Sequence, residues 1–255
     1  MFKNTRFIVI KINKKYIKLF IFIIVMLLIL LISKNLLVIS TIKEMEIKRV
    51  VIDPGHGGVD GGTSDNYGLL EKNINLDFSL KLKKYLLKSN NEVLMTRKKD
   101  VSLEDKCNIN ASRYIRDLTA RKNIINRKNN DIFISIHTNS NPKNPHAKGV
   151  LIFYYKKSSK GKKLAEYISK SINNLVFNEM STHKVYVIPA DYFILRETTK
   201  TGVLIEIGYI TNYQDKKLLQ NDDYKNSLAQ AISYGISNYL HQNKYKPFFK
   251  FTKKR

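Results

Sequence analysis

The chain has 255 residues, 43% of them hydrophobic, which is enough for one globular domain of about 200 residues with a sizeable core and a shorter appendage. Its single cysteine, Cys107, excludes a disulfide within the chain and a cysteine-based zinc site. The formal net charge of +24 favours an anionic partner, such as nucleic acid, a membrane surface or an acidic polymer. Lysine, asparagine and isoleucine are abundant throughout, however, and no RNA-binding or helix-turn-helix signature accompanies the charge, so we predict no nucleic-acid partner.

A long apolar segment lies near the N-terminus. Residues 19–32 are uninterrupted apolar, and with its flanks the segment 16–33 approaches the length that spans a bilayer. A secretory signal peptide is the alternative, but no small-x-small cleavage site follows. Basic residues without one acidic residue precede the apolar core: Lys3, Arg6, Lys11, Lys14, Lys15 and Lys18. By the positive-inside rule we predict a cytoplasmic N-terminus at 1–15, a transmembrane anchor at 16–33, a linker at 34–47 and an extracytoplasmic domain from Lys48.

The first strand of that domain leads into a loop rich in glycine. The β-branched run Val50–Asp53 stops at Pro54, and glycines then surround His56. The run predicts a buried strand, and the proline and glycines predict a sharp loop at its C-terminal end. In open α/β sheets that edge is where ligands bind. A tight turn with a surface histidine is the alternative.

A helix and a second strand follow this loop. Spaced apolar residues predict the helix at 73–88, with Glu71 at or just before its first turn. Favourable charge at a helix N-terminus is a sufficient reason for a glutamate there. A short strand is predicted at 92–96, ending at Arg97, and the polar stretch 98–109 is predicted to be irregular.

The next helix and strand bring a second histidine to a strand end. A helix is predicted at 113–129, where Asp117 and Arg121 have the i,i+4 spacing of an ordinary surface pair. The apolar run 131–139 predicts a buried strand with His137 near its end. The pattern leaves four residues of this region without an assigned role: Arg97, Arg113, Asp117 and Arg121.

The remainder of the chain continues the alternation of strands and helices. Strands are predicted at 149–155 and 202–209, helices at 158–176, 213–219 and 227–241, and one or two short strands in 185–195, broken at Pro189. Glu206 lies inside an apolar run, where a carboxylate is costly unless it is paired, metal-bound or used. His183 lies in a connection with no evident partner, and residues 243–255 form a basic tail.

This alternation predicts an α/β fold, with a mostly parallel central sheet and helices on both faces, behind the N-terminal transmembrane helix. His56, His137 and Glu206 then fall at or near the C-terminal ends of three strands, and Glu71 reaches the same edge. Two histidines and a carboxylate with one open position are a catalytic zinc set, and a second carboxylate handles the proton in hydrolysis. The spacing leaves open which glutamate is the ligand. Two satisfied loop histidines, with Glu206 as an edge-strand carboxylate facing solvent, are the alternative.

Four motifs occur in the order found in one known family: Asp53-Pro54-Gly55-His56-Gly57-Gly58, Leu70-Glu71-Lys72, Ser135-Ile136-His137-Thr138-Asn139 and Ile205-Glu206-Ile207-Gly208-Tyr209-Ile210-Thr211-Asn212. They resemble the zinc N-acetylmuramoyl-L-alanine amidases of bacterial cell walls, and the similarity runs from about Lys48 to Leu240. The resemblance implies a zinc amidase domain at 48–242 with one zinc ion. It also implies that the equivalents of His56, Glu71 and His137 hold the zinc and that Glu206 is the catalytic glutamate.

The single N-terminal anchor and the polar stretch before the segment 113–121 resemble the germination-specific amidases of endospore formers. This implies spore cortex peptidoglycan as substrate, a polysaccharide deacetylase as the partner on the way to muramic-δ-lactam, and a catalytic domain in the forespore intermembrane space. Asn139 and Arg196 are the expected substrate-binding residues, and pairing with Glu197 is an alternative role for Arg196. A vegetative autolysin and an inactive membrane-tethered peptidoglycan-binding module are the competing hypotheses.

Overall fold

The computed structural model describes residues 13–43, 47–65, 67–174, 176–177, 180–181 and 185–241. The chain divides into two compact units, Met1–Glu46 and Ile47–Arg255. Most of the predicted cytoplasmic segment 1–15, the basic tail 243–255 and His183 lie outside the described residues.

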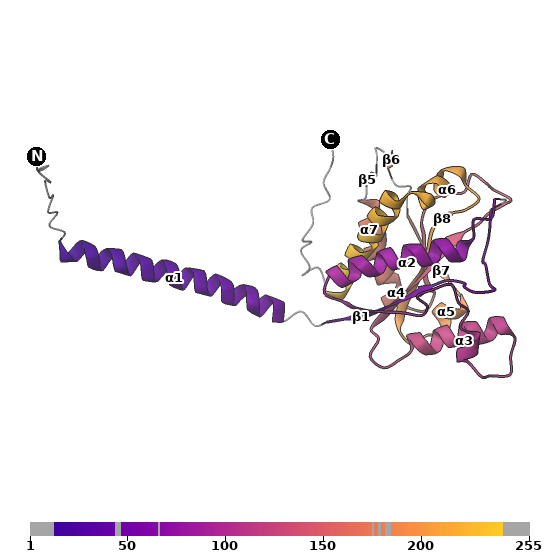
Figure 1. Cartoon of the computed structure of the whole chain (residues 1–255), viewed down its shortest axis with the longest axis horizontal. Helices are drawn as coiled ribbons and strands as arrows, with labels where there is room; N and C mark the ends of the chain where they lie inside the picture. The colour runs from indigo at the N-terminus through magenta and orange to yellow at the C-terminus, as the bar shows by residue number, and fades with distance from the viewer. Residues whose placement is uncertain are drawn as a thin grey trace, which may run out of the picture. The chain divides into compact units, whose positions relative to one another are not determined.

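The first unit is built on one long apolar helix, α1, at Lys14–Lys43 (Figure 1). Its segment Lys14–Lys34 has a mean hydropathy of 2.9 and is not buried in the structure, so it has the length and composition of a membrane span. A helix of this kind near the N-terminus is either a membrane anchor or a signal sequence. It contains the predicted anchor 16–33 and continues into the predicted linker, because the residues that follow Ser33 include neither proline nor glycine.

The second unit is organised around a six-stranded sheet in the order β2-β1-β3-β8-β4-β7. Its strands are β1 (Arg49–Pro54), β2 (Glu92–Met95), β3 (Ile132–Asn139), β4 (Leu151–Tyr155), β7 (Tyr186–Ala190) and β8 (Thr201–Tyr209). β1 pairs in parallel with β2 and β3, and β3 pairs in parallel with β8, whereas β4 is antiparallel to β8. The sheet is therefore mostly parallel, as predicted. A separate ribbon consists of β5 (Val176–Phe177) and β6 (Met180–Ser181).

Helices cover both faces of the sheet, which confirms the predicted layers (Figure 1). They are α2 (Glu71–Lys88), α3 (Arg113–Ile125), α4 (Ser159–Asn173), α5 (Phe193–Arg196), α6 (Tyr213–Gln220) and α7 (Asp222–Leu240), with a 3₁₀ turn η1 (Glu104–Lys106). Because side chains alternate along a strand, Ile134 and Phe133 of β3 face opposite sides. Ile134 packs with α2, α4 and α7, and Phe133 packs with α3 and α5.

Several boundaries differ from the predicted ones. β7 runs through Pro189 without a break, because it is an edge strand, where proline is tolerated. α7 begins at Asp222, ahead of the predicted start, because the side chain of Asn221 caps the backbone N–H of Tyr224. Helices α3 and α4 end earlier than predicted, and the stretch 98–109, predicted to be irregular, contains η1.

Three parallel strands bring their C-terminal ends to one edge of the sheet. The register places Asp53 of β1 opposite Ser135 of β3, and His137 of β3 opposite Glu206 of β8. The register then shifts between His137 and Asn139, where the ladder becomes irregular. Strand pairing therefore brings the predicted site residues His137 and Glu206, and the loop after β1, to this edge.

Candidate active site

The loop that carries His56 is shaped by a close approach of the backbone to a side chain. The N–H of Gly55 bonds to the carbonyl of Ile136 on β3 (2.9 Å). A Cβ at Gly55 would lie 2.3 Å from the imidazole of His137, so only glycine fits. His56 has a φ of 60°, a left-handed conformation in which histidine is enriched. The loop thus brings the rings of His56 and His137 edge to face, with centroids 5.0 Å apart.

Glu71 joins the two histidines from the first turn of α2. Its backbone N–H donates to the carbonyl of Thr63 (2.9 Å), which fixes the start of the helix against the loop. Its Oε1 lies 3.2 Å from Nε2 of His56 and 3.0 Å from Nδ1 of His137. Its Oε2 accepts a hydrogen bond from the N–H of Thr63 (2.9 Å), so the carboxylate has one fixed orientation.

His56, Glu71 and His137 form a group that can bind a metal ion. One donor atom from each residue lies within 4.8 Å of the other two. Two imidazole nitrogens and a carboxylate oxygen are donor types that zinc takes in catalytic sites. Nδ1 of His56 lies 2.8 Å from Oδ2 of Asp60, an outer carboxylate of the kind that orients metal-binding imidazoles.

The pKa values of Glu71 and His56 are both shifted toward the charged forms of these residues. Burial opposes ionisation of Glu71, but hydrogen bonds and charge interactions with His137 and His56 outweigh it, so the pKa of Glu71 lies far below its usual value. Burial lowers the pKa of His56, but Glu71 and Asp60 outweigh that effect and raise the pKa above its ordinary value. Glu71 is therefore ionised at neutral pH, as a metal-binding carboxylate must be.

Glu206 lies directly across from His137, on the neighbouring strand β8. Its Oε2 is buried and has no hydrogen-bond partner among the described residues. Burial raises the pKa of Glu206 to about 7, with His137 opposing the shift and Glu71 adding to it. The edge-strand alternative is wrong, because β3 and β4 flank β8. A buried carboxyl group that titrates near neutral pH is suited to both accept and donate a proton.

Comparison with known proteins identifies the family. The family described as Amidase_3, N-acetylmuramoyl-L-alanine amidase, matches residues 50–238, which contain all of the sheet except its first residue and all four residues above. The chain belongs to the N-acetylmuramoyl-L-alanine amidase family. The enzyme is thus a hydrolase that acts on an amide bond of peptidoglycan.

Named relatives of this amidase come from spore formers and from staphylococci. It is 34% identical over 194 residues to the germination-specific N-acetylmuramoyl-L-alanine amidase of Bacillus subtilis, covering 76% of this chain and 80% of the relative. It is 34% identical over 199 residues to the probable cell wall amidase LytH of Staphylococcus epidermidis, of which it covers 58%. Its fold is similar to that of the CwlD amidase from Clostridioides difficile, solved in complex with the GerS lipoprotein. The TM-score is 0.69 at 32% identity, covering 76% of this chain and 99% of that one.

Two buried arginines hold the loop that carries His56 through its backbone carbonyl groups. Arg97 donates to the carbonyls of Pro54 (3.0 Å) and Gly55 (2.8 Å). Arg121 donates to the carbonyls of Pro54 (2.8 Å) and His56 (2.7 Å). A carbonyl-rich loop of this kind would otherwise bury unsatisfied acceptors, so the guanidinium groups both stabilise the loop and fix its shape.

Arg121 also forms a buried ion pair at the centre of this arrangement. Its Nη1 lies 2.8 Å from Oδ1 of Asp53, with both side chains less than 5% exposed. Burial opposes the charge of Asp53, but Arg121 and a hydrogen bond from Thr96 (2.6 Å) lower its pKa below the usual value. Arg121 contacts Asp117, as the i,i+4 spacing predicts. The prediction that this pair lies on the surface is wrong, because the side of α3 that carries it packs against the loop.

Arg196 lies away from the cluster. It pairs with Glu197 (2.8 Å) and with Asp191 (3.3 Å). It lines a hollow together with Gly202, a residue near the start of β8. Gly202 lies four residues before Glu206, or about 13 Å along the strand. The contacts therefore favour the pairing alternative for this residue.

Asn139 ends β3, where its Oδ1 accepts a hydrogen bond from the N–H of Ser140 (2.7 Å).

Sequence reasoning does not single out three residues that contact the cluster: Asp60, Asn75 and Thr138. Nδ2 of Asn75 and the N–H of Thr138 each donate to the Glu71 carboxylate at 3.1 Å. An asparagine at a position where the helical period predicts burial is the pattern that would have indicated Asn75.

Proposed function

We propose that His56, Glu71 and His137 hold one zinc ion and that Glu206 is the catalytic glutamate. The main support is the convergence of three donor atoms within 4.8 Å, beside a buried carboxylate oxygen without a partner among the described residues. This donor set fits zinc and leaves a coordination position for the substrate. When bound, zinc would act as a Lewis acid that polarises the scissile carbonyl and activates water.

Glu206 carries the proton during hydrolysis of the amide that joins the lactyl group of N-acetylmuramic acid to L-alanine. Its ionised form accepts a proton from the attacking water, and the protonated form donates it to the leaving nitrogen. Burial raises the pKa of Glu206 to about 7 in the metal-free chain, which favours the proton uptake that this role requires. Asp60 keeps His56 in its orientation, and Asn75 does the same for Glu71.

The test uses the full chain, purified in detergent, loaded with zinc and incubated with soluble muropeptides. Glu206→Ala is expected to lower kcat by about 10²- to 10⁴-fold, because a positioned acid–base group contributes that much. Its zinc content should remain at one ion per chain. Glu197→Ala is the matched control, since Glu197 is 42% exposed and pairs with Arg196. Peptide release that survives Glu206→Ala contradicts the assignment.

We propose spore cortex peptidoglycan as the substrate, with a polysaccharide deacetylase completing muramic-δ-lactam from the product. The similarity to the germination-specific amidase of Bacillus subtilis, across 80% of that relative, supports this role. Muropeptide analysis of spores that lack the gene should show no δ-lactam. Normal δ-lactam with a defective vegetative wall favours instead a vegetative autolysin, the role to which the similarity to LytH points.

We propose that residues 1–15 lie in the cytoplasm, that 16–33 anchor the chain, and that 34–47 connect to a zinc amidase domain at 48–242. The length and hydropathy of α1 support the anchor, and the family match from residue 50 supports the domain start. In a sporulating cell this places the domain in the forespore intermembrane space. The full-length chain should stay with membranes after a carbonate wash. A shortened soluble chain would contradict the anchor and support a cleaved signal peptide.

We also infer a lipoprotein as a second partner. The support is the solved complex between CwlD and the GerS lipoprotein, since CwlD is 32% identical to this chain. The chain purified alone should keep its zinc and cleave soluble muropeptides, and its kcat should rise when the lipoprotein is added. A kcat that the lipoprotein leaves unchanged would contradict this partner.

A further inference from the structure

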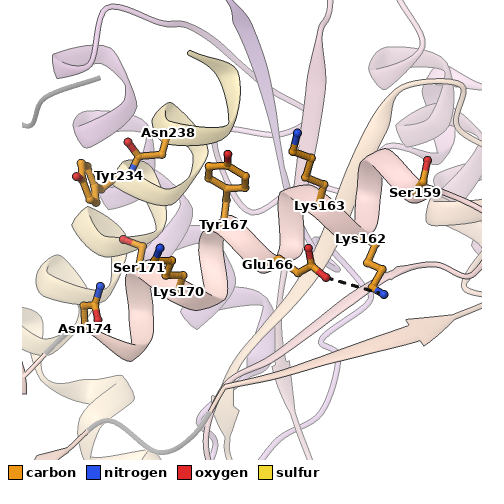
Figure 2. Close-up of a pocket in the computed structure, with 10 residues that line it drawn as sticks. All are labelled: Ser159, Lys162, Lys163, Glu166, Tyr167, Lys170, Ser171, Asn174, Tyr234 and Asn238. Carbon is orange, nitrogen blue, oxygen red and sulfur yellow. Dashed lines mark ion pairs between the residues drawn. The ribbon is translucent and has the colours of Figure 1, made fainter. Parts of the chain in front are cut away.

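A second hollow lies between the outer sides of α4 and α7 (Figure 2). Its volume is about 750 Å³, within the range of sites that hold small organic ligands. The side chains that line it are mainly cationic, aromatic or amide-bearing, and include Lys162, Lys163, Lys170, Tyr167, Tyr234 and Asn238. Figure 2 shows Lys162, Lys163 and Lys170 with the two tyrosines around the same hollow. This surface is called the α4/α7 groove below.

The walls of the α4/α7 groove are held together by direct contacts between the two helices. The hydroxyl of Ser171 donates to the carbonyl of Ala231 on α7 (2.6 Å). A Cβ at Gly235 would lie 2.6 Å from Cα of Ile168, so the helices approach as closely as glycine allows. The ring of Tyr167 packs edge to face on that of Tyr239, with centroids 6.0 Å apart. The groove therefore exists before a ligand arrives, which lowers the cost of binding.

The α4/α7 groove is separate from the active site. The inner sides of α4 and α7 pack on the sheet face that carries Ile134 and Ile205. Because strand side chains alternate, His137 and Glu206 project to the opposite face. A ligand in the groove consequently leaves the catalytic edge open.

The charge of the groove is available to a ligand. Lys163 and Lys170 are exposed, and neither forms an ion pair with any residue that the structure describes. Lys162 makes only a distant pair with Glu166, at 3.9 Å. Lys163 and Lys170 are seven residues apart on one helix, which sets their backbones about 10 Å apart along α4. Such a spacing suits a ligand with more than one carboxylate.

We propose that the α4/α7 groove is a second binding site for peptidoglycan, and that it holds a carboxylate-bearing glycopeptide stretch of the strand outside the active site. The proposal rests on the amidase function. Tyrosine faces suit sugar rings, the amides of Asn174 and Asn238 suit hydroxyl and peptide groups, and the lysines suit the carboxylates of stem peptides. A flat membrane surface fits a concave site poorly. The site retains the enzyme on the polymer between cleavages.

The test compares a polymer with a small substrate, using the full chain in detergent. Lys163→Glu combined with Lys170→Glu reverses the charge of the groove. Lys84→Glu combined with Lys128→Glu changes the net charge equally at exposed lysines elsewhere. Binding to insoluble peptidoglycan is measured by co-sedimentation in a Glu206→Gln background, and hydrolysis of a soluble muramoyl peptide is measured without that change. The groove pair should weaken co-sedimentation by about tenfold, since two reversed charge contacts amount to roughly that factor. It should leave hydrolysis of the soluble peptide unchanged, and the control pair should change neither.

A neutral variant tests the shape of the groove independently of its charge. Asn238→Trp places a bulky uncharged ring in the hollow and should reduce co-sedimentation as strongly as the lysine pair does. Equal losses in the groove pair and the control pair would assign retention to overall charge and overturn the proposal. Unchanged co-sedimentation, with poly-L-glutamate bound at the groove instead, would assign the surface to an acidic protein and overturn it as well. Failure of the wild-type chain to cleave the soluble peptide would contradict the amidase function, not the groove, because co-sedimentation does not depend on turnover.

Discussion

Removing Arg121 should strongly destabilise the catalytic unit. The side chain of Arg121 is 4% exposed, and its guanidinium group contacts the carboxylates of Asp53 and Asp117 and the carbonyls of Pro54 and His56. Arg121→Ala leaves Asp53 buried without its cation, and removing one partner of a buried ion pair costs about 3–5 kcal/mol. For a domain of this size each kcal/mol shifts Tm by about 2–4 °C. The expected fall in Tm is therefore about 6–20 °C.

The assay is differential scanning calorimetry of the full chain in detergent, because the chain has no tryptophan to report unfolding by fluorescence. Arg113→Ala is the control, since Arg113 pairs with Glu104 but is 58% exposed. An exposed pair contributes about 0–1 kcal/mol, so this variant should melt within about 4 °C of wild type. Arg121→Lys should recover only part of the loss, because an ammonium group cannot reach all four acceptors at once. If Arg121→Ala melts no lower than Arg113→Ala, the buried pair is not a major source of stability and the reasoning is wrong.

Three further predictions concern the active site. The raised pKa of Glu206 means that the folded state binds a proton more tightly than the unfolded state does. The stability of the metal-free chain should therefore fall by about 3 kcal/mol as the pH rises from 4.5 to 7, and Glu206→Gln should remove most of this fall in urea unfolding. Gly62→Ala should weaken zinc binding in a competition assay, because its Cβ would lie 2.5 Å from Oε2 of Glu71. Gly68→Ala is the control, because Gly68 also has a positive φ but an added Cβ there would meet no atom within 4 Å. It should introduce backbone strain alone and leave zinc affinity unchanged. A chelator should lower Tm of the zinc-loaded chain, by the equivalent of about 2.7 kcal/mol at a zinc concentration 100 times Kd, and should leave His137→Ala unaffected.

The sequence by itself determined those features that depend on neighbours along the chain. The apolar segment 16–33 shows its character residue by residue, and the alternation of strands and helices follows from hydrophobic periodicity. Placing His56, His137 and Glu206 together needed only one rule beyond this, that parallel strands end at a common edge. The family resemblance then separated the roles of the two glutamates, which spacing had left open.

Only the tertiary structure decided the contacts between distant residues. Arg121 has the helical spacing of a surface pair with Asp117, yet it is buried because α3 packs against the loop more than 60 residues earlier in the chain. Pro189 ends strands by local rules, but β7 continues because it lies at the sheet edge. The α4/α7 groove likewise depends on how two helices pack, through Ser171 and Gly235. Local sequence fixes which residues a helix presents, whereas close packing in three dimensions decides what those residues meet.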